Sequence, residues 1–232
     1  MKKYFLRFLP LYISMTTILL GIVVFADKAV AVLAETRPVP RKTIIIIDPG
    51  HGGEDGGAVS CSGAYESTIN LQIALRLNDL CHLLGFETRM IRSTDISIYT
   101  QGESLAAKKA SDLKNRVKMV NGTENGILIS IHQNSFSDSQ YCGAQVFYAH
   151  TSGSKELASC LQQQLRLMDP KNNRKIKSAD HVYLMQHIQR RGVLVECGFL
   201  SNPQEEAKLR LDRYQKCLSA ALATALLRDG GT

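Results

Sequence analysis

The sequence predicts an α/β sandwich built around a mostly parallel sheet. Short apolar runs alternate along the chain with longer segments whose apolar residues recur every three to four positions, as strands and helices do. Residues 44–47 are four consecutive isoleucines, which is typical of a strand buried on both faces. Behind the N-terminal segment, roughly 190 residues remain, which is enough for one large core and short for two.

The N-terminal segment has the pattern of an export signal. Residues 8–26 form a mostly apolar run without a charge, and Lys2, Lys3 and Arg7 precede it. Small residues at 29–34 offer cleavage sites, although the run is also long enough to remain as an anchor. With the basic end inside, the rest of the chain is exported under either interpretation.

The chain therefore divides into three parts. We expect residues 1–34 to be a signal peptide or membrane anchor, and residues 35–41 to be a linker that contains Pro38 and Pro40. This linker disfavours the alternative in which the apolar run is a buried core helix. Residues 42–232 then form one exported catalytic domain, either secreted or anchored to the membrane.

The remaining elements follow from the same patterns. Runs too short for a helical period are assigned as strands, and glycines mark several of the ends. The expected strands are 86–91, 126–131, 143–149 and 192–195, and the expected helices are 66–84, 105–120, 153–168 and 203–227, with a polar loop at 92–104.

Histidine and acidic side chains follow three of these strands. His51 stands on a tight turn after the isoleucine strand, because Pro49 cannot donate to a ladder and the glycines allow a sharp bend. His132 and Glu196 come at the ends of two later strands. Glu66 begins the first helix, where the helix dipole favours an ionised carboxylate. In open α/β sheets, functional sites collect at the carboxyl edge, so we expect these side chains there.

Three of these residues fit a catalytic zinc site. Zinc takes imidazole and carboxylate ligands, and a catalytic site keeps a fourth position open for water. His51, Glu66 and His132 supply such a set, although composition and spacing alone leave a chance set as the alternative. A phosphate-binding turn is disfavoured, because the glycine loop lacks both the P-loop ending and G-x-G-x-x-G spacing.

Charge and cysteine usage add weaker constraints. The formal charge of +7 suggests an anionic partner such as cell-wall polymer, membrane surface or nucleic acid, although the basic N-terminus explains part of it. The six cysteines show no CxxC spacing, so a structural zinc knot is not supported. We expect Cys81, Cys197 and Cys217 to be buried free thiols. A bridge between Cys61 and Cys142 is the less favoured alternative to free thiols.

Four motifs follow one another along the chain. They are Asp-Pro-Gly-His-Gly-Gly at 48–53, Glu66 with Asn70 and Leu71, Ser-Ile-His-Gln-Asn at 130–134, and Val-Leu-Val-Glu-Cys-Gly-Phe-Leu-Ser-Asn at 193–202. In this order they resemble the zinc-dependent N-acetylmuramoyl-L-alanine amidases of the Amidase_3 type, over nearly the whole exported part. The anchor-like N-terminus and the absence of a wall-binding repeat in the sequence resemble the spore-cortex members in particular.

This resemblance implies a three-layer sandwich with a twisted six-stranded sheet flanked by helices. It also implies zinc held by His51, Glu66 and His132, with Glu196 as the catalytic carboxylate. The bond cut joins N-acetylmuramic acid to the L-alanine of the peptidoglycan stem peptide. In spore-cortex members, peptide removal prepares the sugar for conversion to muramic-δ-lactam by a separate deacetylase.

The same resemblance bears on partners and location. Besides the peptidoglycan substrate, it implies an accessory sporulation protein and the downstream deacetylase as partners, and no nucleic acid. The expected location is the forespore intermembrane or cortex region. Two rival functions are a zinc peptidase with the same ligands and a non-catalytic module that binds the wall or docks a partner.

Several residues near the motifs have an open role. Asp48 either orients a histidine ligand or its loop, or only caps the turn, and Asn134 either supports its loop or contacts substrate. The basic stretch 169–191 departs from the family pattern, which puts substrate contacts there in doubt. We expect its two histidines, His181 and His187, to be surface residues rather than ligands.

Overall fold

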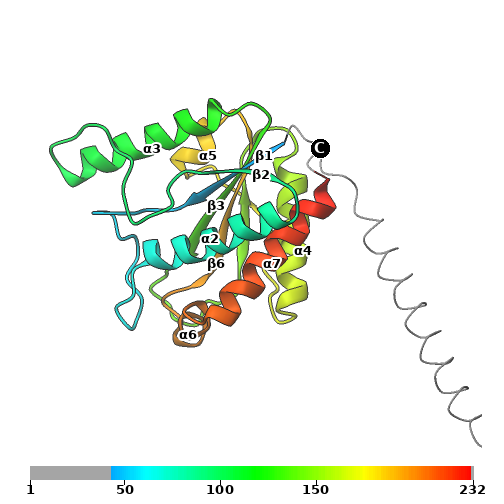
Figure 1. Ribbon diagram of the computed structural model, residues 1–232. Helices are drawn as coiled ribbons and strands as arrows, with labels where there is room; N and C mark the ends of the chain where they lie inside the picture. The colour runs from blue at the N-terminus through cyan, green and yellow to red at the C-terminus, as the bar shows by residue number, and fades with distance from the viewer. Residues whose placement is uncertain (1–42, 231–232) are drawn as a thin grey trace, which may run out of the picture. The chain divides into compact units, whose positions relative to one another are not determined.

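The computed structural model describes residues 43–230, which form a sheet with helices packed on both of its faces (Figure 1). The expected signal or anchor at 1–34 and the linker at 35–41 lie outside the described residues. Within residues 43–230, no helix is both long and apolar enough to cross a membrane.

The sheet has six strands, all parallel to their neighbours except at one pair. Starting from one edge, the order is β2-β1-β3-β6-β4-β5, and only β4 and β6 pair antiparallel. The strands are β1 (Ile44–Pro49), β2 (Glu87–Met90), β3 (Gly126–Asn134), β4 (Gln145–Tyr148), β5 (Lys177–Ser178) and β6 (Arg191–Phe199). The predicted mostly parallel, six-stranded α/β sandwich is confirmed.

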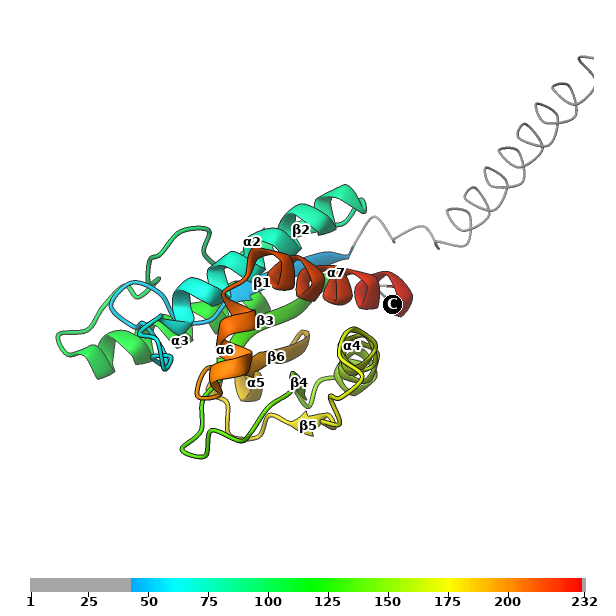
Figure 2. The same ribbon diagram turned by 90° about the horizontal axis from the view of Figure 1, so that it is seen from below.

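Helices cover the sheet in two layers (Figures 1 and 2). Helices α2, α4 and α7 share one hydrophobic core with the sheet, whereas α3 and α5 close a smaller core on the opposite face. The described helices are α2 (Glu66–Leu83), α3 (Leu105–Asn121), α4 (Ser154–Met168), α5 (Tyr183–His187), α6 (Pro203–Leu209) and α7 (Asp212–Asp229).

Strand β1 contributes to both cores. Ile45 and Ile47 lie in the core beneath α2, α4 and α7, whereas Ile46 lies in the core on the other face. All three side chains are fully buried, and each contributes about 1.5–3 kcal/mol relative to exposure. The interpretation of the isoleucine run as a strand buried on both faces is confirmed, and this buried strand leads directly into the glycine turn.

The structure differs from the predicted elements after residue 169. The expected helix 203–227 is two helices, because the chain is extended at Leu211 and the Gln215 side chain donates to the carbonyl of Leu209, at the end of α6. Strand β5 and helix α5 lie in the stretch where no element was expected. They are too short, at two and five residues, to show a periodic pattern.

Two strand ends and several cysteines also differ from expectation. β3 and β6 continue past His132 and Glu196 instead of ending on them. Cys61 and Cys142 are exposed free thiols, so the alternative of a bridge is not supported. Cys217 is exposed rather than buried, because it lies on the outer face of α7, whereas Cys81 and Cys197 are buried as expected.

Candidate active site

The carboxyl edge of the sheet brings the predicted residues together. His51 follows β1, and His132 and Glu196 are register partners on the adjacent strands β3 and β6. Glu66 is the first residue of α2. Ligand atoms of His51, Glu66 and His132 all lie within 4.8 Å of one another, in a group that could hold a metal ion. His132 lies 66 positions after Glu66 and 81 positions after His51 along the chain. These distant residues thus meet at one edge of the sheet, as the strand ends predict.

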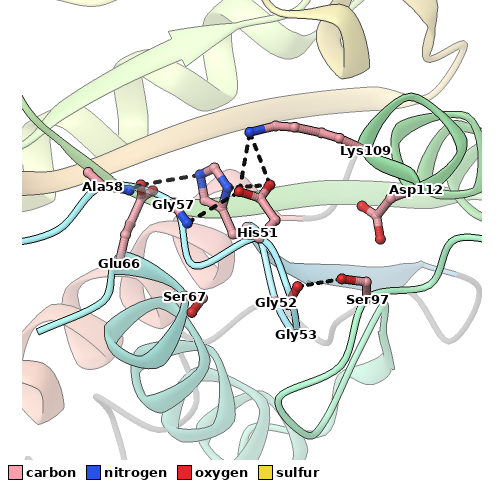
Figure 3. A network of polar contacts seen from close by, with 12 residues as sticks. His51, Gly52, Gly53, Gly57, Ala58, Glu66, Ser67, Ser97, Lys109 and Asp112 are labelled. Atoms are coloured by element: carbon pink, nitrogen blue, oxygen red, sulfur yellow. Dashed lines mark hydrogen bonds and ion pairs between the residues drawn. The ribbon is translucent and has the colours of Figure 1, made fainter. Parts of the chain in front are cut away.

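The carboxylate of Glu66 lies between the two imidazole rings. Its Oε1 is 2.9 Å from His132 Nδ1. Its Oε2 is 3.2 Å from His51 Nε2, and Figure 3 shows these two residues facing each other. The backbone N–H groups of Ala58 and Gln133 donate to the same carboxylate. Burial favours the neutral acid, but the hydrogen bonds and charges of both histidines outweigh it and hold the pKa of Glu66 far below its usual range.

The ring of His51 is held on its other side by Asp55. Asp55 Oδ2 is 2.8 Å from His51 Nδ1, and Lys109 Nζ lies 3.1 Å from the same oxygen. Burial alone lowers the pKa of His51, but hydrogen bonds to Asp55 and Glu66 raise it to about 9. A carboxylate on the second ring nitrogen is the usual support of a histidine that binds zinc, because it fixes the tautomer and the ring orientation.

Asp48 supports the turn rather than the ring. Its carboxylate is fully buried, accepts a hydrogen bond from Ser130 Oγ at 2.7 Å, and forms an ion pair with Arg116. Arg116 also donates to the carbonyl oxygens of Pro49 and His51 at 3.0 and 2.8 Å. Of the roles considered for Asp48, the geometry favours support of the loop, through the guanidinium of Arg116.

Two further side chains fix the turn from the opposite side. Buried Arg92 donates to the carbonyl oxygens of Pro49, Gly50 and Ser67, each at 2.9 Å. Asn70 donates to the carbonyl of Gly50 as well. Buried carbonyl groups of an irregular turn need such donors, because a buried carbonyl without a partner costs stability.

Glycine is required where the backbone passes close to His132 and Glu66. A Cβ atom on Gly50 would lie 2.2 Å from the ring of His132. At Gly57, φ is +69° and a Cβ atom would lie 2.6 Å from Glu66 Oε2. His51 itself has a φ of 61°, a left-handed conformation that is uncommon outside glycine. Gly50 and Gly57 therefore permit the close approach of the backbone to the side chains of His132 and Glu66.

Glu196 has the environment of a general base. Its Oε2 atom is buried and has no hydrogen-bond partner among the described residues. Burial raises the pKa of Glu196 to about 7, with the charge of Glu66 adding to the effect and His132 and His51 opposing it. A carboxylate with a pKa near neutrality can accept and return a proton.

These side chains line one cavity of about 210 Å³. His51, His132 and Glu196 lie along the sheet, while α3 contributes Lys109, Leu113 and Arg116 and the segment around α5 contributes Val182 and Leu184. The stretch 169–191 thus reaches the site through aliphatic side chains. His181 and His187 are exposed, as expected.

The donor set fits zinc. Three ligands about 2.1 Å from a tetrahedral zinc ion lie roughly 3.4 Å apart. One ligand atom from each of His51, Glu66 and His132 lies within 4.8 Å of the others, so small side-chain adjustments would bring the set to this spacing. Two imidazoles and one carboxylate are also a known ligand set of catalytic zinc.

Helix α6 ties two loops of the site together. Glu205 accepts hydrogen bonds from the N–H groups of Gly143 and Phe199, each at 2.9 Å. The next residue, Glu206, accepts from Ser60 Oγ at 3.2 Å. The loop that leads into α2 and the loop that follows β3 are therefore both fixed to successive residues of one short helix.

Sequence reasoning missed Asp55, Arg92 and Arg116 as supports of the site. The roles of Asp55 and Arg92 depend on the path of the turn, which no periodic pattern shows. For Arg116 a signal exists: Asp112, Arg116 and Val120 occupy one buried stripe of α3 at intervals of four. Charged residues on a buried stripe need partners. The backbone carbonyl of Asn134 accepts from Leu200 N at 2.8 Å, a contact that does not involve the side chain, so the role of that side chain in loop support or substrate contact stays a prediction.

With this geometry in place, comparison with known proteins identifies the family. The Amidase_3 family, described as N-acetylmuramoyl-L-alanine amidase, matches residues 45–228. The chain belongs to this amidase family. The match covers nearly all of the described residues, so the enzyme class read from the four motifs is confirmed.

Individual amidases show how far the similarity extends. The germination-specific N-acetylmuramoyl-L-alanine amidase of Bacillus subtilis (strain 168) is 36% identical over 187 residues, covering 80% of this chain and 78% of that protein. The structure of the CwlD amidase from Clostridioides difficile in complex with the GerS lipoprotein matches with a TM-score of 0.78 and 36% identity, covering 81% of this chain and 98% of that one. An N-acetylmuramoyl-L-alanine amidase from Clostridium difficile 630 gives a TM-score of 0.71 at 29% identity, covering 82% and 97%.

Proposed function

We propose that this amidase is zinc-dependent and cleaves the bond between N-acetylmuramic acid and the L-alanine of the peptidoglycan stem peptide. One observation carries the proposal. In a chain of the Amidase_3 family, His51, Glu66 and His132 converge beside a buried, unpaired oxygen of Glu196. The first three residues would hold the metal, and Glu196 would remain free for proton transfer.

Each residue then has a separate task in hydrolysis. Bound zinc supplies a Lewis acid that polarises the amide carbonyl and lowers the pKa of water toward neutrality. Glu196 accepts a proton from the attacking water and returns it to the nitrogen of the leaving L-alanine. Asp55 keeps the ring of His51 in one tautomer, and Arg116 holds the turn that carries this ring.

The biological setting we propose is the spore cortex. The similarity to a germination-specific amidase supports this setting, and the similarity to a CwlD amidase in complex with a lipoprotein supports an accessory protein partner. Removal of the stem peptide would prepare the sugar for a separate deacetylase on the route to muramic-δ-lactam. The apolar run at 8–26 supports export, by a signal peptide or an anchor, to the forespore intermembrane or cortex region.

Two substitutions test the assignment of roles. Glu196→Gln keeps the size of the side chain but removes the proton acceptor, so turnover on a muramoyl-dipeptide should fall by about 10²–10⁴ with zinc retained. His132→Ala removes one of three ligands, so bound zinc and turnover should fall together. His82→Ala, at an exposed histidine on α2, is the control and should change neither quantity.

The outcomes distinguish the alternatives. Loss of zinc from Glu196→Gln would make Glu196 a ligand, and full zinc occupancy in His132→Ala would refute the ligand set. Cleavage of a bare peptide in preference to the muramoyl-dipeptide would indicate a zinc peptidase. Zinc binding without turnover on either substrate would indicate a non-catalytic module.

A further inference from the structure

Two exposed aromatic rings lie on the loop that follows β3. Phe136 and Tyr141 are 55% and 42% exposed, and their rings meet edge to face with centroids 5.0 Å apart. Behind them, Tyr141 stacks on the buried ring of Phe199. The guanidinium of Arg174 lies over the rings of Tyr141 and Phe199, at 5.4 and 4.8 Å from their centroids. We call these four residues the aromatic corner.

The loop that carries the aromatic corner is anchored at several points. Phe136 N donates to Ser201 Oγ at 3.1 Å, and Asn202 Nδ2 donates to the carbonyl of Ser139 at 2.9 Å. Arg174 Nε donates to the carbonyl of Cys142 at 2.8 Å. The rings are therefore held in an exposed position instead of folding into the core, where burial would stabilise them.

The aromatic corner adjoins the proposed active site. In the pairing of β3 with β6, His132 opposes Glu196, and after a register shift Asn134 opposes Phe199, two residues further along β3 and three along β6. Two residues of strand correspond to about 7 Å. Phe199 and the aromatic corner therefore lie beside the 210 Å³ cavity, further along the ends of β3 and β6, and not within its lining.

The chemistry of this loop suits a sugar. A pyranose ring has an apolar face of C–H groups and a rim of hydroxyl groups, so it needs a flat apolar surface flanked by small polar side chains. Between and beside the two rings the loop exposes Ser135, Ser137 and Gln140, which can exchange hydrogen bonds with hydroxyls. The carboxylates of a stem peptide would instead require a free cation, and the guanidinium of Arg174 is already engaged by the rings and a carbonyl. The charged side chain on the loop itself, the exposed Asp138, would repel those carboxylates.

We propose that the aromatic corner binds a sugar of the glycan strand next to the muramoyl residue whose amide is cut. This inference rests on the proposed function and adds a subsite for the polymer. Phe136 and Tyr141 provide the surface on which the sugar ring packs. The subsite contributes to the binding of long glycan strands and does not contribute to substrates that end at one muramoyl residue.

Kinetics of the full-length protein with two substrates test the proposal. For Phe136→Ala/Tyr141→Ala, KM on glycan strands that bear stem peptides should rise about tenfold, because two ring contacts are lost. Its kcat on the strands, and both constants on a muramoyl-dipeptide, should stay unchanged. Tyr141→Phe keeps the ring and should behave as the parent. Leu167→Ala, at a 63% exposed side chain on α4, is the matched surface control.

A binding measurement makes the result independent of turnover. Peptide-free glycan strands should co-sediment with the parent chain and with Glu196→Gln, and about tenfold more weakly with the double variant. Equal KM changes on both substrates, or unchanged binding to peptide-free strands, would overturn the subsite. Failure of the parent to cleave either substrate while this binding difference persists would instead refute the amidase assignment and leave the sugar subsite supported.

Discussion

The buried guanidinium of Arg116 is the most informative position at which to perturb the site. In Arg116→Met the side chain keeps much of its volume but loses its charge and all its donors. The ion pairs with Asp48 and Asp112 are then broken, and the carbonyls of Pro49 and His51 each lose a donor. Neither the proposed zinc ligands nor Glu196 are altered by the substitution.

The expected loss of stability is large because the partners remain buried. The side chains of Arg116, Asp48 and Asp112 are 3%, 1% and 12% exposed. Removing one partner of a buried pair costs about 3–5 kcal/mol, since the other charge is left without compensation. We therefore expect Arg116→Met to lower the free energy of unfolding by about 4 kcal/mol at pH 7.

The dependence of this loss on pH has a defined sign. In the parent, burial alone raises the pKa of Asp48, but Arg116 and the hydrogen bond from Ser130 hold it below its usual value. Ionised Asp48 thus stabilises the parent above the ordinary carboxylate pKa, and this contribution is lost as pH falls through the lowered pKa. In the variant, burial acts without Arg116 and raises the pKa, so stability falls as pH rises through it. The difference between the two proteins should be smaller at pH 4.5 than at pH 7.

Urea unfolding followed by circular dichroism measures this difference. Both proteins are compared at pH 4.5 and pH 7 with a chelator present, so that zinc binding does not contribute. Adding Asp48→Asn to Arg116→Met should recover part of the stability at pH 7, because the unpaired carboxylate is removed. A loss below about 1 kcal/mol, or a loss that is the same at both pH values, would refute the role given to the buried pair.

Two further substitutions test how the turn presents the ligands. Asp55→Asn should weaken zinc binding about 10- to 100-fold in a chelator competition, because the ring of His51 loses its carboxylate support, whereas Glu54→Gln on the same loop should have no effect. Gly57→Ala should also weaken zinc binding in this assay, because its Cβ would collide with the carboxylate ligand, whereas Gly63→Ala shares a positive φ but meets open space and should leave zinc affinity unchanged. Equal zinc affinity within either pair would contradict the corresponding role.

The sequence predicts the strands that carry the site residues more reliably than it predicts the contacts that support those residues. Four isoleucines, a proline and glycines are local signals, and they place His51 at the end of a buried strand without knowledge of its neighbours. Likewise, parallel strands bring their carboxyl ends to the same edge of a sheet in any fold of this class. The meeting of His51, His132 and Glu196 at this edge could therefore be expected.

Supports that depend on tertiary structure could not be predicted in the same way. Asp55 reaches the ring of His51 only because His51 has a positive φ, which the residue type does not suggest. The pairing of Asp48 with Arg116 joins positions 68 residues apart, and many other pairings are equally compatible with the chain. For α6 and α7, one apolar periodicity continues across a break at Leu211, where the backbone is extended and the Gln215 side chain donates to the carbonyl of Leu209.

The contacts of Glu205 and Glu206 in α6 bear on the point in synthesis at which the chain could become active. All proposed ligands and the proposed base are complete once residue 196 has been made, yet the loops around them are fastened by Glu205 and Glu206. A nascent or truncated chain that ends before this helix contains every reactive group. It lacks the hydrogen bonds to Glu205 and Glu206 that hold the surrounding loops. Chains that end between residues 197 and 204 should therefore be inactive although they contain every proposed ligand and the proposed base, so hydrolytic activity would appear only after α6 has been made.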